Sequence, residues 1–296
     1  MDIRKLLSAL SFLFLTGITG FSMVTSRQDS LITNTVLYRV THTESGHVSY
    51  LFGTHHAFGK PFFDSLRFAG EAVRSSGMLI KENLNIPGHL AEDIINQRSS
   101  ATKWKRYLDR ENEAYIRGLF SSSNLQFDKM TPAELFAFLT RYYKEQVCIG
   151  KDPDATYFSL DDYIETVARQ HQLEVVGLET SEEQVFLINE DVKGMPRKVH
   201  KRRIENMIHR LRTESVDHCA EIDWYRNMDF DFRFDQPCQN ALVLTDRNEN
   251  WMVQLRAYLS SENCFVAVGL SHLMFECGLI RQLADSGYQI ESIPVK

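Results

Sequence analysis

Two short motifs of the same form, Gly-x-x-His, stand far apart in this chain. One runs from Gly53 to His56 and the other from Gly269 to His272. Each follows directly on an apolar run of the kind that forms a β-strand. The fold must therefore contain two strands whose ends each carry a glycine and then a histidine. Strand-end histidines from distant segments are the ligands that a divalent metal site needs, so the pair predicts metal-dependent chemistry.

Apolar runs bounded by turn residues predict the strands. The first two flank a glycine-containing turn at 44–46 and are expected to form a hairpin. The expected strands are 36–40, 47–52, 78–82, 174–178, 264–268 and 288–293. Glycine at the end of the second strand, Gly53, is expected to let the backbone turn sharply and approach a ligand.

Helical spacing of apolar residues fills most of the remaining chain. Asp64 is expected to cap the first helix, and the run Thr131-Pro-Ala-Glu134 predicts a capping box. The expected helices are 64–77, several within 87–146, 160–172, one that begins at 181, 241–259 and 275–285. A basic run at 197–212 and an acidic run at 217–235 favour the solvated faces of two helices that pair with each other.

This alternation predicts an α/β domain with a mixed central β-sheet flanked by helices, in which the opening hairpin supplies antiparallel edges. We expect a single domain over 30–296, with a helical insertion at about 87–150 after the second βα unit that covers the sheet and shapes a substrate cleft. The 296 residues are 43% hydrophobic and 24% charged, enough for a substantial core. A net charge of −6 gives no general attraction to phosphate backbones, so nucleic acid is not an expected partner.

The first residues differ from the rest. Arg4 and Lys5 precede an almost continuous apolar stretch at 6–24, which is the layout of a secretory signal peptide over 1–26. An uncleaved anchor of the same length would tether the protein to a membrane, and the sequence leaves both alternatives open. In either case the rest of the chain is exported to the periplasm or secreted.

Five cysteines lie in the exported part, at 148, 219, 238, 264 and 277. Export places them where disulfides form, and the odd number predicts at least one that is free or paired with another chain. Their connectivity stays open. No Cys-x-x-Cys pair is present, which argues against a thiolate zinc knuckle.

Two acidic residues also end predicted strands. Glu82 closes the strand at 78–82, and Glu179 follows the strand at 174–178. In open α/β sheets ligand sites gather beyond the carboxyl ends of strands, so His56 and Glu82 share one crevice if their strands are neighbours. The alternation of an extended chain turns His55 away from His56, so we expect His55 to support the loop.

At these positions the chain resembles the TraB/GumN family, also called TraB/PrgY/GumN. This family is related to the Tiki metalloproteases and more distantly to the erythromycin esterases and the ChaN haem-binding proteins. The resemblance spans nearly the whole exported chain, in the right order. The matching stretches are Tyr50–His56, the strand that ends in Glu82, Gly177–Thr180 with Gln184, Arg247-Asn248 with Trp251, and Val266–His272.

The resemblance implies a ChaN/erythromycin-esterase-like fold and a metal-dependent hydrolase. The activity it favours is that of a metallopeptidase acting on a peptide or protein. It implies His56, His272 and Glu82 as metal ligands, and Glu82, Glu179 and Arg247 as catalytic residues. The alternative is a non-catalytic protein of the ChaN type, in which the same histidines bind haem or iron. The substrate and the oligomeric state stay open.

Elementary chemistry gives these assignments content. Two neutral imidazoles and a carboxylate form a mixed nitrogen and oxygen set suited to Mn²⁺, Co²⁺, Zn²⁺ or Fe²⁺. A metal in such a site activates water and polarises a carbonyl group. Glu179, or Glu82 if it is not a ligand, is the expected general base. Arg247 is expected to hold a carboxylate of the substrate or of a metal ligand.

Overall fold

The computed structural model of the protein describes residues 34–150 and 159–296. The expected signal or anchor at 1–26 lies outside this range. Within the described ranges, no helix is both long enough and apolar enough to cross a membrane. Export and membrane tethering therefore stay predictions.

A mixed six-stranded sheet lies at the centre of the described residues, with strand order β4-β3-β5-β2-β1-β6. The strands β2, β5, β3 and β4 run parallel, and β1 runs antiparallel to both β2 and β6. This confirms the mixed sheet and the antiparallel opening hairpin. The hairpin does not form an edge as expected, because β6 pairs with the outer side of β1. The strands are β1 Leu37–Thr41, β2 Val48–Thr54, β3 Met78–Asn83, β4 Glu174–Glu179, β5 Cys264–Gly269 and β6 Gln289–Ile293.

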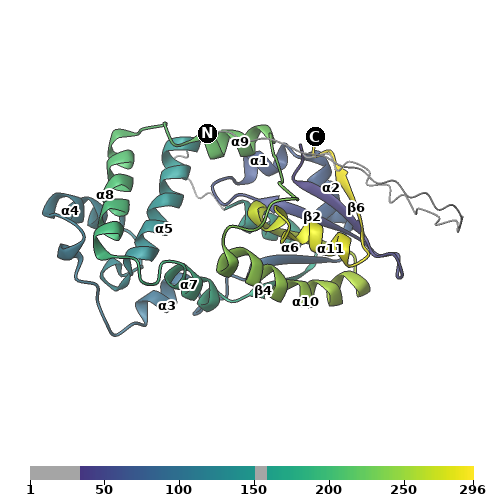
Figure 1. The fold of residues 1–296 in the computed structure, drawn as a ribbon, viewed down its shortest axis with the longest axis horizontal. Helices are drawn as coiled ribbons and strands as arrows, with labels where there is room; N and C mark the ends of the chain where they lie inside the picture. Colours follow the sequence, from purple (N-terminus) through teal and green to yellow (C-terminus); the bar gives the residue numbers. More distant parts are fainter. Residues whose placement is uncertain (1–33, 151–158) are drawn as a thin grey trace, which may run out of the picture. The chain divides into compact units, whose positions relative to one another are not determined.

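Helices flank this sheet, as the alternating pattern predicted (Figure 1). All residues of β5 up to Val268 are buried, as are those of β3 up to Glu82, because both faces of the inner strands are covered. The helices are α1 Lys60–Asp64, α2 Arg67–Ser75, α3 Ala91–Asn96, α4 Arg110–Leu119, α5 Pro132–Tyr143, α6 Leu160–Gln170, α7 Ser181–Glu190, α8 Arg197–Thr213, α9 Ala220–Asn227, α10 Asp246–Ser261 and α11 Leu279–Asp285. Shorter helical turns are η1 Trp104–Arg106, η2 Phe127–Lys129, η3 Lys144–Ile149, η4 Ala241–Thr245 and η5 Leu270–Leu273.

A second hydrophobic core lies outside the sheet, among α4, α5 and α8, which stand together in Figure 1. Its aromatic part stacks Phe127 on Trp104 and Phe120, and its aliphatic part includes Ile204 and Ile208 of α8. Two separate chain segments thus build this helical layer. The helical stretch expected at 87–146 supplies α3, α4 and α5, and the basic run at 197–212 completes the layer as α8.

The turns and caps that the sequence indicates are confirmed where few residue types can adopt the required geometry. Gly46 adopts a positive φ of 75° in the β1–β2 turn, and Gly287 adopts 89° after α11. The capping box of α5 forms as predicted: the Thr131 hydroxyl accepts from the Glu134 N–H, and the Glu134 carboxylate accepts from the Thr131 N–H.

Other boundaries were predicted wrongly. Asp64 does not cap a following helix, because it ends α1, where its carboxylate binds Lys60 and the hydroxyl of Tyr163. The residue before α2 is Leu66, which supplies no side-chain cap. The expected helix at 241–259 begins with the π-helical turn η4, and α10 then continues to Ser261.

The expected helices at 275–285 and 217–235 are both shorter than predicted. The last helix, α11, starts at Leu279, because the backbone N–H groups of Phe275 and Glu276 bind the chain after α9, at Phe232 and Gln236. Within the acidic run only α9 is helical. Its Glu221 pairs with Lys144 of η3, and Arg212 of the basic helix α8 pairs with Glu111 of α4.

Two disulfides join segments that are distant in the sequence. Cys148 in η3 bonds to Cys219 before α9, and Cys238 bonds to Cys277 after η5. Cys264, the first residue of β5, is buried and is not in a disulfide. The odd cysteine count therefore leaves one free thiol, as the sequence predicted.

This pairing predicts the outcome of non-reducing peptide mapping on protein made in an oxidising compartment. Mass spectrometry should find the linked pairs Cys148–Cys219 and Cys238–Cys277. The Cys264 thiol should react with a maleimide only after denaturation, because burial shields it and raises its pKa to about 12. A linked peptide that contains Cys264 would contradict the pairing.

Candidate functional site

The carboxyl ends of the parallel strands lie level at one edge of the sheet. In the β2–β5 pair, Thr54 stands opposite Gly269, and in the β3–β4 pair, Asn83 stands opposite Glu179. Side chains that follow these strands therefore meet at the same edge, where ligands bind in open α/β sheets.

One cavity of about 780 Å³ opens at this edge, and four of the five predicted site residues line it: His56, His272, Glu82 and Arg247. The condition of neighbouring strands is not met, because β5 separates β2 from β3. His56 and Glu82 nevertheless border the same cavity. The fifth predicted residue, Glu179, does not line the cavity but accepts a hydrogen bond from Arg247, which does.

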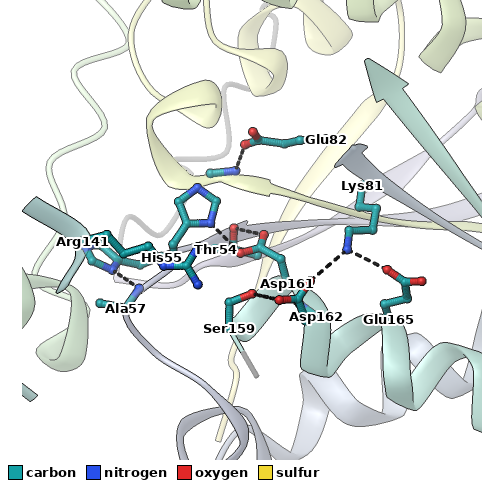
Figure 2. A network of polar contacts seen from close by, with 12 residues as sticks. Thr54, His55, Ala57, Lys81, Glu82, Arg141, Ser159, Asp161, Asp162 and Glu165 are labelled. Atoms are coloured by element: carbon teal, nitrogen blue, oxygen red, sulfur yellow. Dashed lines mark hydrogen bonds and ion pairs between the residues drawn. The ribbon is translucent and has the colours of Figure 1, made fainter. Parts of the chain in front are cut away.

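His56 is oriented by a carboxylate that the sequence analysis missed. Its Nδ1 lies 2.7 Å from the Oδ2 of Asp161, and Asp161 Oδ1 accepts a 2.7 Å hydrogen bond from the Thr54 hydroxyl. Figure 2 shows Thr54 and Asp161 in this network. The Asp161 charge raises the pKa of His56 to about 9. Since Nδ1 faces Asp161, Nε2 is the nitrogen left for the cavity, into which the imidazole is 54% exposed.

His272 is oriented by an amide. Its Nδ1 lies 2.7 Å from the Oδ1 of Asn248, whose NH₂ group donates to the carbonyls of His272 and Cys277. Because both amide hydrogens are used in this way, the Asn248 oxygen is the acceptor, and the His272 proton lies on Nδ1. Burial lowers the pKa of His272 to about 4, so the ring is neutral and presents an unprotonated Nε2.

Glu82 is held at the bottom of the cavity as a carboxylate. Its Oε1 accepts from the Gly269 N–H at 2.7 Å, and its Oε2 accepts from Arg247 at 3.1 Å and from Gln184 at 3.3 Å. Burial alone would raise its pKa, but the neighbouring imidazoles and the Arg247 guanidinium hold the pKa of Glu82 below its usual range.

The glycines of the two motifs serve close packing. A Cβ on Gly269 would lie 3.1 Å from Glu82 Oε1, so a glycine lets this carboxylate reach the backbone. A Cβ on Gly53 would lie 2.6 Å from a methyl group of Leu270, so that glycine lets η5 pack on β2. The expectation that Gly53 provides a sharp turn near a ligand is wrong, because Gly53 lies inside β2.

Arg247 links three of the other site residues. Its Nε and one terminal nitrogen donate to the two oxygens of Glu179, and that nitrogen also donates to Glu82. Its other terminal nitrogen donates to His272 Nε2 at 3.0 Å. One guanidinium thus faces two carboxylates, with Glu179 and Glu82 only 6% and 9% exposed. The cluster retains an excess negative charge, which favours a further cation nearby.

The nitrogen and oxygen donors are of the types that bind a divalent metal, but the side chains lie too far apart to bind one ion together. In the described part of the chain, no group of three His, Cys, Asp or Glu side chains lies close enough to hold an ion. His272 Nε2 and Glu82 Oε1 are 4.0 Å apart, and Arg247 donates to both residues. Both imidazoles are anchored through Nδ1, the arrangement that metal-binding histidines usually show. Binding an ion would require Arg247 to release His272.

Sequence reasoning missed the partners of the two histidines. Asp161 looked like part of an ordinary helix start, because it follows Ser159, whose hydroxyl caps α6. Asn248 was noted only beside Arg247. His55 lies as expected for a loop support: its Nε2 contacts Glu221 at 3.0 Å, and its Nδ1 accepts from the Ala57 N–H (Figure 2).

The His56–Asp161 pair predicts a measurable titration in the metal-free protein. NMR should show that His56 keeps its second proton up to about pH 9, compared with 6.5 for an unperturbed histidine. Stability from this pair is fully present below pH 6.5 and is lost as the pH rises through about 9. Asp161→Asn should bring the pKa of His56 down by more than one unit. An unchanged His56 pKa in this variant would rule out the assigned cause.

The Gly269 contact predicts a second effect. Gly269→Ala should destabilise the protein by about 1–3 kcal/mol in chemical denaturation, because the new methyl group meets Glu82 Oε1. Gly118→Ala is the matched control, since nothing lies within 4 Å of its Cβ position in α4, and it should be neutral or slightly stabilising. Equal effects of the two changes would refute the packing argument.

Comparison with known protein families matches residues 36–292 to the TraB/PrgY/gumN family. No curated protein and no solved structure matches the chain. The match covers both Gly-x-x-His motifs and every strand of the sheet except the last residue of β6. The chain therefore belongs to the TraB/PrgY/gumN family.

Proposed function

We propose that the protein is an exported metal-dependent hydrolase, and more specifically a metallopeptidase of the TraB/GumN/Tiki type. One observation carries the proposal. Two histidines from distant strands are each fixed through Nδ1, and both border one cavity beside the ionised Glu82. Anchoring through Nδ1 to a carboxylate or an amide is the arrangement that metal-binding histidines usually show, because it fixes the ring and directs Nε2 to the ion.

His56 Nε2, His272 Nε2 and the Glu82 carboxylate would hold the ion. This set of two nitrogens and one carboxylate suits Mn²⁺, Co²⁺, Zn²⁺ or Fe²⁺ and leaves coordination positions for water and substrate. When bound, such an ion lowers the pKa of a bound water to about 7 and polarises a carbonyl group.

Arg247 has a defined part in this proposal. The two oxygens of Glu179 anchor its Nε and one terminal nitrogen, so the guanidinium stays in place when His272 binds another partner. The nitrogen that now donates to His272 would then be free to donate to the negative charge that develops on a substrate carbonyl oxygen.

The two carboxylates expected as general base differ in position. Glu82 borders the cavity, whereas both oxygens of Glu179 are occupied by Arg247 and one of them also accepts from Gln184. Glu179 therefore supports catalysis through Arg247. Glu82 borders the cavity and would act as the base toward a water there only where it does not ligate the ion.

Metal analysis and peptide cleavage test the proposal together. The purified exported domain should contain one divalent ion per chain. A chelator should abolish its cleavage of a peptide mixture, and added Mn²⁺ or Co²⁺ should restore that cleavage. His56→Ala and His272→Ala should each lose the ion and at least about 100-fold in kcat/KM while remaining folded by circular dichroism.

His89→Ala is the control, because this imidazole is 65% exposed and pairs with Glu182 on the surface. It should keep both metal and activity. Full metal occupancy in the His56 and His272 variants would refute the ligand assignment. A Soret band on addition of haem, without metal-dependent hydrolysis, would instead support the haem- or iron-binding alternative.

A further inference from the structure

We propose that Arg203 binds a carboxylate of an extended peptide substrate, in the part of the cavity that α5, α7 and α8 enclose. The inference rests on the proposed peptidase function and adds a preference for acidic substrates. Its evidence comes from residues outside the metal-ligand cluster.

The cavity continues well beyond the strand ends along one face of α5 and η3. The lining residues there run from Ala133 through Phe136 and Thr140 to Lys144, at helical spacing. At 1.5 Å per residue this face is roughly 16 Å long. An extended peptide rises about 3.3 Å per residue, so roughly five residues fit along the wall.

A second wall is one face of α7, which has apolar as well as polar residues. It contributes Leu187 and Ile188, and the latter is 36% exposed. Ala133 and Ala137 of α5 leave room between the walls because their side chains are small. A partly exposed apolar cleft that leads to a polar centre suits a peptide chain better than a small polar metabolite.

Four Lys and Arg side chains line this cavity, and three of them have carboxylate partners. Arg141 donates to Glu145, Lys144 pairs with Glu221 at 2.6 Å, and Arg247 pairs with Glu82 and Glu179. The carboxylates satisfy these three charges within the protein.

Arg203 is different. Its guanidinium carbon lies 4.0 Å from the centre of the Phe136 ring, and its Nη1 contacts the sulfur of Met195 at 3.3 Å. Among residues 34–150 and 159–296, the structure pairs Arg203 with the Phe136 ring and the Met195 sulfur and with no carboxylate. Its charge also acts on His200, whose pKa burial and Arg203 together lower.

A partly buried guanidinium on an aromatic ring, with neutral partners, is a site for a carboxylate that arrives with a ligand. The ring fixes the plane of the guanidinium, so the donors are already ordered for a bidentate contact. The acid can be a side chain of the peptide or its terminal carboxylate, and the experiment below separates these sources.

Matched peptides test the inference. The cleavage rate should be measured for pairs of peptides that carry Glu or Gln at one position, with that position moved along the peptide. Each pair should be made once with a C-terminal carboxylate and once with a C-terminal amide. The wild-type protein should favour one acidic form by about 10-fold or more in kcat/KM, mainly through KM. Arg203→Gln should remove that preference by lowering kcat/KM for the acidic peptide to its value for the neutral peptide, and Arg203→Glu should reverse the preference toward Lys-containing peptides.

Arg202→Gln is the matched control, because Arg202 is an exposed neighbour on α8 that does not border the cavity. It should keep the wild-type preference. Equal cleavage of acidic and neutral peptides by the wild-type protein would overturn the role of Arg203 and leave the peptidase proposal intact.

Fluorescence-polarisation binding of the same peptides to the wild-type protein and to His56→Ala separates the two proposals. If no peptide is cleaved but acidic peptides bind about 10-fold more tightly in an Arg203-dependent way, the carboxylate site stands and the hydrolase proposal fails. Binding without any acidic preference would refute the Arg203 site.

Discussion

The parallel pairing of β5 with β2 on one side and β3 on the other is the constraint on which the site depends. Parallel strands present their carboxyl ends at one edge, so the residues after β2 and β5 and at the end of β3 meet there whatever their separation in sequence. The β2–β5 register places Thr54 opposite Gly269, which keeps the two Gly-x-x-His motifs level. A slip of one residue would reverse the faces of a whole strand and break the Glu82 contact with the Gly269 N–H.

At this edge of the sheet, the protonation states of the two site histidines are set by their surroundings rather than by residue type. Asp161 favours the charged form of His56, whereas burial and Asn248 keep His272 neutral, so two residues of the same type differ at neutral pH. Arg247 allows two carboxylates to stay buried within one cluster. Such a cluster is costly to break, because the loss of Arg247 would leave two buried carboxylates without the cation that pairs with both.

The sequence was most informative where a single residue type satisfies a strict geometric need. Gly46 marked a real turn, and Thr131 with Glu134 marked a real cap, because few residues satisfy those geometries. Asp64 failed as a cap since an aspartate can satisfy its oxygens in many other ways, here with Lys60 and Tyr163. Among site residues, the strand-end positions were predictable from periodicity and family resemblance. Asp161 was not, because its pairing with His56 depends on how α6 packs across the sheet.

The cavity itself combines two independent parts of the fold. Strand ends supply the polar centre, whereas α5, α7 and α8 supply a long apolar wall and Arg203. The second hydrophobic core packs α5 and α8 against each other. Cys148–Cys219 ties the end of the α5 wall to α9, which carries Glu221. Substitutions in the wall should therefore change the shape and charge of the cavity while the histidines and Glu82 keep their geometry.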